Sequence, residues 1–342
     1  MAGATALPRE LDPRRLRRRA ATFAAVLGAG ALVVALAPGL GDVRDELRGA
    51  AAGWLVVAVA LEVLSSASYV LLFRPVFCRR MSWRASAELG GTALAVGSLL
   101  PASGIGGLAA GAWILHRNGM PGPQIARRSV AFFLIKGSVN FVAVAVLGVL
   151  LAAGVLGPDL SPWLTAVPAA MSIALITAVL ALPRVGPGPD PRPGAPRLVR
   201  GASAVRRGVI GGVEEAAAIV RARDPLVLGG AVGYWAFDNA VLWATFQAVD
   251  ADVALSVILF GYLIGQLGGL LPLPGGLGGM DGGLIGCLVV LGAPLAATTA
   301  AVLAYRVVLF WVPLLLGAVA FAGLRRDMDH LLPRRDEPAP RR

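Results

Sequence analysis

Long apolar segments separated by short polar loops run through most of the chain. This pattern predicts membrane-spanning helices, because a helix needs about 20 apolar residues to cross the hydrocarbon core of a bilayer. The segments long enough to be full spans are 20–37, 51–73, 129–155, 163–182, 225–248 and 295–324. Two further apolar regions, 88–115 and 254–291, are interrupted by proline and glycine. The pattern therefore predicts an all-α polytopic membrane protein with about six full spans and two broken helical hairpins.

The two interrupted regions contain a similar phrase, LLPASGIGGLAAG at 99–111 and LLPLPGGLGGMDGGLIG at 270–286. Proline removes a backbone donor and clashes with the preceding helical turn, whereas glycine permits close backbone approach. Unwound backbone at membrane depth is tolerated only where protein buries it or where it lines a cavity, so matching interruptions in two halves indicate a substrate site. The candidate substrate-binding residues in the two phrases are Pro101, Ser103, Gly104, Gly106, Gly107, Pro272, Pro274, Gly275, Gly276 and Gly278.

The charges of the loops predict the orientation of the chain, because arginine-rich loops remain in the cytoplasm. The expected cytoplasmic positions are Arg80, Arg128, Arg207 and Arg326, and the expected outer positions are Asp45, Asp159 and Asp252. Basic loops flank the first hairpin on both sides, so it opens from the cytoplasm, whereas the second opens from outside. The two hairpins are therefore expected to form an inverted repeat, with both termini in the cytoplasm.

The same pattern divides the chain into two membrane halves and three polar parts. The expected parts are a basic N-terminus at 1–19, a first half at 20–182, a linker with an amphipathic helix at 183–224, a second half at 225–324 and a charged tail at 325–342. In the linker, apolar residues between 198 and 222 recur at helical spacing opposite arginines. Such a helix is suited to lie on the anionic lipids of the inner leaflet.

Composition supports the membrane class and excludes several others. The chain has 342 residues, of which 57% are hydrophobic and 15% charged, with a mean hydropathy of +0.74. The net charge of +11 arises from loops beside apolar segments, which is a membrane pattern and not a nucleic-acid-binding one. The Arg, Ala, Gly and Pro bias is typical of a GC-rich bacterial genome, so the bacterial cytoplasmic membrane is the expected location. Cys78 and Cys287 form no metal-binding or disulfide pattern, no catalytic motif is present, and we expect neither a cofactor nor an enzyme.

Ionisable residues inside the apolar segments are functional candidates, because their burial is costly. They are Glu62, Glu88, Lys136, Asp238, Asp281 and Arg306. Lys136 and Arg306 each follow a broken hairpin, so the two cations and the free amides at helix starts form a candidate phosphate site. Alternatively, they pair with Asp281, Asp238 or Glu62 to join helices, and Lys136 also has the length to reach a membrane surface.

The acidic residues in the apolar segments, together with Asn239, are predicted to have different roles. Asp281 begins the helix after the second break, and an antiparallel approach of the next span predicts that it pairs with Arg306 when the site is empty. Glu62, Asp238 and Asn239 are candidates for a gate or for ion coupling, although for Asp238 and Asn239 a satisfied helix contact is the favoured interpretation. Glu88 lies close to a membrane boundary and is expected to be solvated.

The segments PGGLGGMD at 274–281 and YRVVLFWVPLLLG at 305–317 resemble the flippase-like family of the membrane half of lysylphosphatidylglycerol synthases. Pro274, Gly275, Gly276, Gly278 and Arg306 fit the family pattern, whereas Asp281 stands where the family usually has glutamate. The first phrase lacks the charged residue that the family often has after its glycines. The resemblance implies a polytopic lipid translocase with two re-entrant hairpins. A stand-alone member without the aminoacyl-transfer domain is expected.

Three functions therefore remain open from the sequence. The first is translocation of an anionic phospholipid or a polyprenyl-phosphate-linked substrate between leaflets. The second is a non-transporting membrane subunit of a glycosyltransferase or lipid-modifying enzyme, and the third is an ion-coupled carrier of a small solute. Nucleic acid is not an expected partner.

Overall fold

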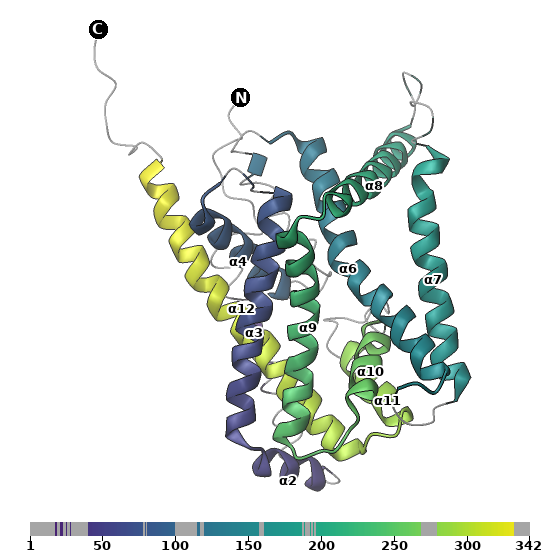
Figure 1. Ribbon diagram of the computed structural model, residues 1–342. Helices are drawn as coiled ribbons and strands as arrows, with labels where there is room; N and C mark the ends of the chain where they lie inside the picture. Colours follow the sequence, from purple (N-terminus) through teal and green to yellow (C-terminus); the bar gives the residue numbers. More distant parts are fainter. Residues whose placement is uncertain are drawn as a thin grey trace.

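The computed structural model describes residues 40–77, 81–99, 120–156, 161–186, 196–267 and 279–331, together with a few isolated positions. Within these residues the chain is helical and contains no strand (Figure 1). The helices are α2 (Gly41–Gly49), α3 (Ala52–Phe77), α4 (Trp83–Leu99), α6 (Gly122–Ala152), α7 (Pro162–Val185), α8 (Arg197–Arg221), α9 (Pro225–Ala248), α10 (Leu255–Leu267), α11 (Gly279–Val290) and α12 (Leu295–Leu331).

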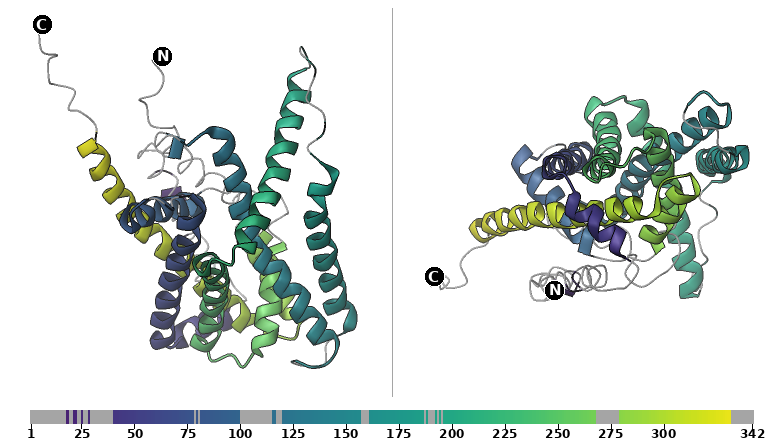
Figure 2. Two further views of the ribbon diagram at one scale, coloured as in Figure 1. Left: turned by 45° about the horizontal axis from the view of Figure 1, so that its top comes forward. Right: turned by 90° about the horizontal axis from the view of Figure 1, so that it is seen from below.

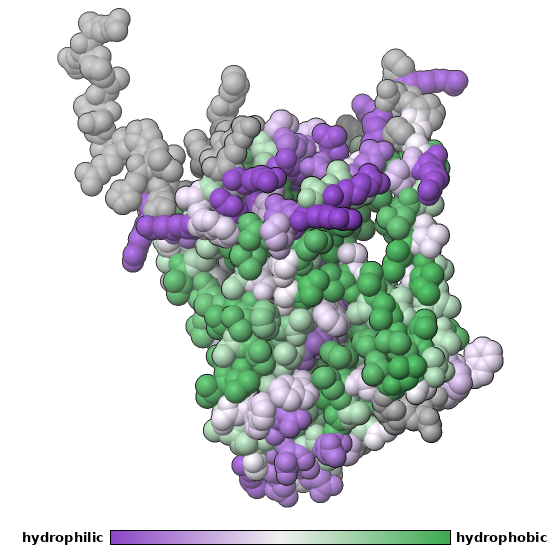
Figure 3. All heavy atoms as spheres, in the orientation of Figure 1, coloured by the Kyte–Doolittle hydropathy of each residue, from purple (hydrophilic) through white to green (hydrophobic). Residues whose placement is uncertain are grey.

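Four described helices are long and apolar enough to cross a membrane, namely Ala52–Phe77, Gly122–Ala152, Pro162–Val185 and Leu295–Leu324. Helix α9 has 24 residues and lies alongside α3 (Figure 2). Space-filling atoms show a broad apolar band between two polar ends (Figure 3). These features confirm the all-α polytopic membrane class. The predicted first span, 20–37, lies largely outside the described residues.

The long helices extend beyond the apolar segments that predict them. Helix α3 continues to Phe77, α7 to Val185 and α12 to Leu331, each past the last residue of its apolar segment. The predicted tail at 325–342 therefore begins as helix. Arginine has a high helix propensity, so the backbone stays helical where the chain leaves the apolar layer.

Helices α10 and α11 form a tight antiparallel pair. They have 13 and 12 residues, so each is about 20 Å long, too short to cross a bilayer. A Cβ added at Gly265 would lie 2.7 Å from Leu284 Cα, and one at Gly261 would collide with Leu288. Glycine therefore permits the close contact. The start of α10 and the end of α11 lie at the face that carries α2 (Figure 1). The phrase that joins the two helices lies outside the described residues.

Helix α4, which precedes the other broken phrase, packs against the last third of α12 through small residues. A Cβ at Gly317 would fall on Ala95 and lie 2.8 Å from the Gly91 carbonyl oxygen, and one at Gly91 would lie 3.0 Å from Ala320 Cβ. Small residues at such a crossing let the backbones approach closely. Helix α12 contacts α4 in this way, and it also contacts α11.

We expect Gly317→Leu to destabilise the fold by about 1–3 kcal/mol, because the side chain has no space at this crossing. The control is Gly229→Leu, since a Cβ at Gly229 meets no atom within 4 Å. Thermal unfolding in detergent, followed by circular dichroism, measures both variants. Equal unfolding temperatures for the two would contradict tight packing between α4 and α12.

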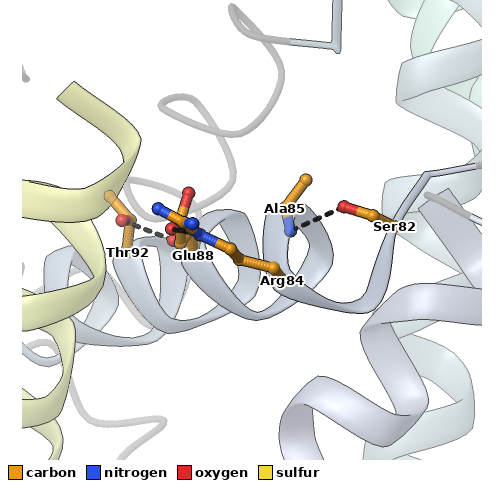
Figure 4. A network of polar contacts seen from close by, with 5 residues as sticks. All are labelled: Ser82, Arg84, Ala85, Glu88 and Thr92. Carbon is orange, nitrogen blue, oxygen red and sulfur yellow. Dashed lines mark hydrogen bonds and ion pairs between the residues drawn. The ribbon is translucent and has the colours of Figure 1, made fainter. Parts of the chain in front are cut away.

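Glu88 is buried at the same crossing, so the expectation that it is solvated is wrong. Its carboxylate accepts a hydrogen bond from Arg84 Nε at 3.0 Å, and its backbone carbonyl accepts one from Thr92 Oγ1 at 2.6 Å (Figure 4). A Cβ at Gly323 would lie 2.6 Å from Glu88 Oε1. The absence of a side chain on α12 at this point leaves the space that the carboxylate occupies.

Helix α8 lies across the end of the bundle and only part of its apolar face is free. Ile210, Val213 and Ala216 are buried, and Arg128 at the start of α6 donates to Glu215 at 3.1 Å. Leu198, in contrast, is 87% exposed. The first turns of α8 therefore present apolar surface beside arginines, while its later turns belong to the core.

The start of α6, α8 and the end of α12 lie at one polar face, and α2 and the α9–α10 turn lie at the opposite one (Figure 1). Single cysteines in a background without Cys78 and Cys287 test which face is cytoplasmic. Cysteines at 128, 207 and 326 are expected to be inaccessible to an impermeant reagent added outside, and cysteines at 45 and 252 to react. Labelling of position 128 from outside would contradict the predicted orientation.

Candidate functional site

A cavity of about 330 Å³ lies among α3, α4, α6, α9, α10 and α12. Its polar and charged lining residues are Glu62, Tyr69, Lys136, Asn140, Tyr234, Trp235, Asp238, Tyr262 and Arg306. Glu62, Lys136 and Asp238 each stand near the middle of their helix. The cavity thus gathers four of the six ionisable residues predicted in the membrane.

Close packing of α3 against α9 forms one wall of this cavity. A Cβ at Gly230 would lie 2.5 Å from Leu72 N, and one at Gly233 would lie 2.7 Å from Ser68 Oγ. Because glycine lets the two helices approach, Glu62 of α3 and Asp238 of α9 reach the same cavity.

Arg306 joins α12 to α11 through Asp281. Arg306 Nε donates to Asp281 Oδ1 at 2.8 Å, and a second guanidinium nitrogen also contacts this oxygen. Their side chains are 21% and 20% exposed, so the pair is mostly buried. The expected contact between Asp281 and Arg306 is therefore present.

Lys136 lies among aromatic rings and has no ion-pair partner in the part of the chain that the structure describes. Its Nζ lies 5.1 Å from the ring centroid of Tyr234, 5.7 Å from that of Phe133 and 5.8 Å from that of Tyr69. Such contacts stabilise a cation without neutralising it. Lys136 therefore neither reaches a membrane surface nor pairs with a described carboxylate, and it remains available to an anion.

Asp238 and Asn239 have different surroundings although they are neighbours in sequence. Tyr262 and Tyr305 both donate to Asp238, the second at 3.3 Å. Asn239 Nδ2 donates to the Trp235 carbonyl at 2.8 Å within the same helix, and Asn239 does not line the cavity. Asp238 thus belongs to the cavity, while the side chain of Asn239 bonds within its own helix.

Several polar atoms at the cavity have no hydrogen-bond partner within the described residues. They are Glu62 Oε2, Asn140 Oδ1 and Trp235 Nε1, and Glu62 is only 4% exposed. A buried polar atom without a partner costs about 1–3 kcal/mol. Two acceptors and one donor on cavity-lining residues are thus unsatisfied within the described residues.

The sequence matches the family described as lysylphosphatidylglycerol synthase TM region over residues 21–317. The chain belongs to this family. It is also 31% identical over 86 residues to a UPF0104 membrane protein of Methanothermobacter thermautotrophicus, a match that covers 25% of this chain and 26% of that protein. The chain thus matches about a quarter of the length of this relative.

All four tyrosines of this member of the lysylphosphatidylglycerol synthase TM family belong to the site, and the sequence analysis missed them as site residues. Tyr69, Tyr234 and Tyr262 line the cavity, and Tyr305 binds Asp238. The available signal was their rarity, because all four lie inside long apolar segments. A tyrosine buried in a membrane helix needs a partner for its hydroxyl group.

The predicted binding residues in the two broken phrases of this family member lie outside the described residues. They are Pro101, Ser103, Gly104, Gly106, Gly107, Pro272, Pro274, Gly275, Gly276 and Gly278. The cavity is lined by Leu94 and Gly97 of α4 and by Tyr262 of α10, which precede these phrases in the sequence.

Proposed function

We propose that the chain is a lipid translocase that moves an anionic phospholipid or a lipid-linked phosphate between leaflets. One observation carries the proposal: Lys136, a cation without a described carboxylate partner, lies in a polar cavity in the middle of an apolar helical bundle. A buried cation at membrane depth that forms no direct ion pair is costly and is typical of a substrate pathway.

The chemistry of the cavity supports a phosphate ligand. Lys136 supplies a compact cation, and Arg306 a planar guanidinium already held by Asp281. A phosphate that contacts Lys136 then competes with Asp281 for Arg306, because both anions accept from the same nitrogens. Trp235 also lines the cavity, and its buried Nε1 has no hydrogen-bond partner within the described residues. Exchange between Asp281 and phosphate allows the ligand to be both bound and released.

The test is reconstitution of the purified chain in vesicles with fluorescent phosphatidylglycerol, phosphatidylcholine or a polyprenyl-phosphate-linked sugar. Quenching from outside measures movement between leaflets. We expect movement of at least one anionic lipid and its loss in Lys136→Met. The control is Arg48→Met, whose arginine is exposed on α2. If the folded wild-type protein moves none of these lipids, the proposal fails.

Glu62 favours a second candidate function, coupling of transport to a cation. Its Oε2 atom is buried without a partner, so a proton or a small cation would satisfy it. Transport by the wild type would then depend on a proton or sodium gradient, and Glu62→Gln would remove this dependence. Equal gradient dependence in both proteins would exclude Glu62 as the coupling group.

The first turns of α8 support a proposed contact with anionic lipids at the cytoplasmic surface. Exposed Leu198 and Val205 there lie beside several arginines. This combination is typical of helices that bind the inner leaflet. If the chain is instead a non-transporting subunit, a partner enzyme would co-purify with it and remain fully active with Lys136→Met.

A further inference from the structure

A second cavity, of about 400 Å³, lies beside the polar one. It is bounded by α6, α7 and α8, and its wall is apolar apart from Ser138 and Arg221. The apolar residues of this wall include Phe141, Ile176 and Val179. Polar and apolar cavities share Phe133 and Gly137, so they adjoin on α6.

The polar cavity has room for a headgroup and not for hydrocarbon chains as well. Its 330 Å³ is at the lower end of the volumes that hold small ligands. A hydrocarbon chain placed there would also cover Glu62 and Asp238 without offering them a partner, which is costly. A lipid bound by its phosphate therefore needs a separate apolar place for its chains.

The apolar cavity is placed to serve this purpose. Leu180 of α7 lines it and is 59% exposed, so this wall faces the lipid side of the bundle. Arg221, at the end of α8, supplies a basic group on its rim. Arginine binds phosphate groups well.

Gly137 lines both cavities. A Cβ at this position would meet no heavy atom within 4 Å, so the space beside it is open. A larger side chain there would occupy this space without a collision in the fold.

We infer that the apolar cavity between α6, α7 and α8 is the binding groove for an acyl or isoprenoid chain of the lipid whose phosphate occupies the polar cavity. This inference rests on the proposed translocase function. The lipid enters laterally between α6 and α7, with its headgroup passing Gly137 toward Lys136 and its chain remaining in the groove.

The test uses a phosphatidylglycerol with a diazirine near the end of one acyl chain, in nanodiscs of phosphatidylcholine. After illumination, mass spectrometry compares labelling of the groove segments, 133–141 and 175–180, with labelling of the outward face of α3. Val56 and Val59 on that face are exposed and report ordinary lipid contact. We expect preferential labelling of the groove.

Gly137→Leu is expected to reduce groove labelling by about tenfold, since excluding even two methylene groups from the groove has an effect of this size. The matched control, Gly229→Leu, adds the same side chain on α9 in open space and is expected to label like the wild type. Equal labelling of the groove and of α3, or unchanged groove labelling in Gly137→Leu, would overturn the inference.

Movement between leaflets, measured on the same preparations, separates this inference from the translocase proposal. Preferential groove labelling without lipid movement supports a lipid-chain site and contradicts translocation. Lipid movement with uniform labelling supports translocation and contradicts the groove.

Discussion

Replacing Arg306 with glutamine is expected to weaken binding of an anionic lipid by about tenfold or more, because a charge-assisted hydrogen bond contributes roughly 1.5–3 kcal/mol. Arg306 lines the polar cavity and is oriented by its bond to Asp281 at 2.8 Å. Glutamine keeps a donor of similar reach but carries no charge. Binding of fluorescent phosphatidylglycerol to the purified protein measures the effect.

Asp281→Asn is expected to have the opposite effect on binding. Without the carboxylate, nothing competes with the lipid phosphate for the guanidinium of Arg306. The lipid therefore binds more tightly and leaves more slowly. Translocation therefore becomes slower although affinity rises. The substitution also removes the countercharge of the mostly buried Arg306, at a cost of about 1–3 kcal/mol in the free energy of unfolding.

The double variant completes the test of this exchange. Arg306→Gln removes the group for which lipid and Asp281 compete, so adding Asp281→Asn should then change lipid affinity little. The effects on affinity and on translocation rate are thus expected to be non-additive. Additive effects in this cycle would mean that the two residues act separately, and the exchange mechanism would be wrong.

Lys136→Met is expected to reduce lipid translocation by about a hundredfold, which corresponds to roughly 3 kcal/mol of lost phosphate interaction. Lys136 forms no ion pair with a described carboxylate, although Asp238 lies in the same cavity and interacts with it electrostatically, so an anionic ligand can bind the ammonium group directly. Methionine keeps an unbranched apolar chain and a favourable contact with Tyr69, Phe133 and Tyr234.

The thermal stability of Lys136→Met separates a binding role from a structural one. Removing a buried cation relieves its desolvation cost, while losing the aromatic contacts removes a stabilisation of about 0.5–2 kcal/mol. These effects oppose each other, so we expect an unfolding temperature close to that of the wild type. A variant that unfolds much earlier, or that still moves lipid at the normal rate, would contradict a role for Lys136 in phosphate binding.

The class of the protein and the candidate residues of its site follow from the sequence alone. Apolar segments of membrane-spanning length predict helices because backbone polar groups in lipid must be satisfied within the segment. A charged residue within such a segment is also easily recognised from the sequence. This applies to Glu62, Lys136, Asp238 and Arg306. The contact between Asp281 and Arg306 was also predictable, because only a short turn separates their helices.

Which of these charges form ion pairs depends on the packing of the helices in three dimensions. Lys136 is surrounded by rings from α3, α6 and α9, whose rotation and spacing depend on the packing of residues such as Gly230 against Leu72. The burial of Glu88 likewise depends on Gly323, which is more than 200 residues away in the chain. Apolar length and loop charge are local properties that a sequence displays directly. The side of a helix that meets its neighbour is decided by the fit of small and large side chains, and this fit exists only in three dimensions.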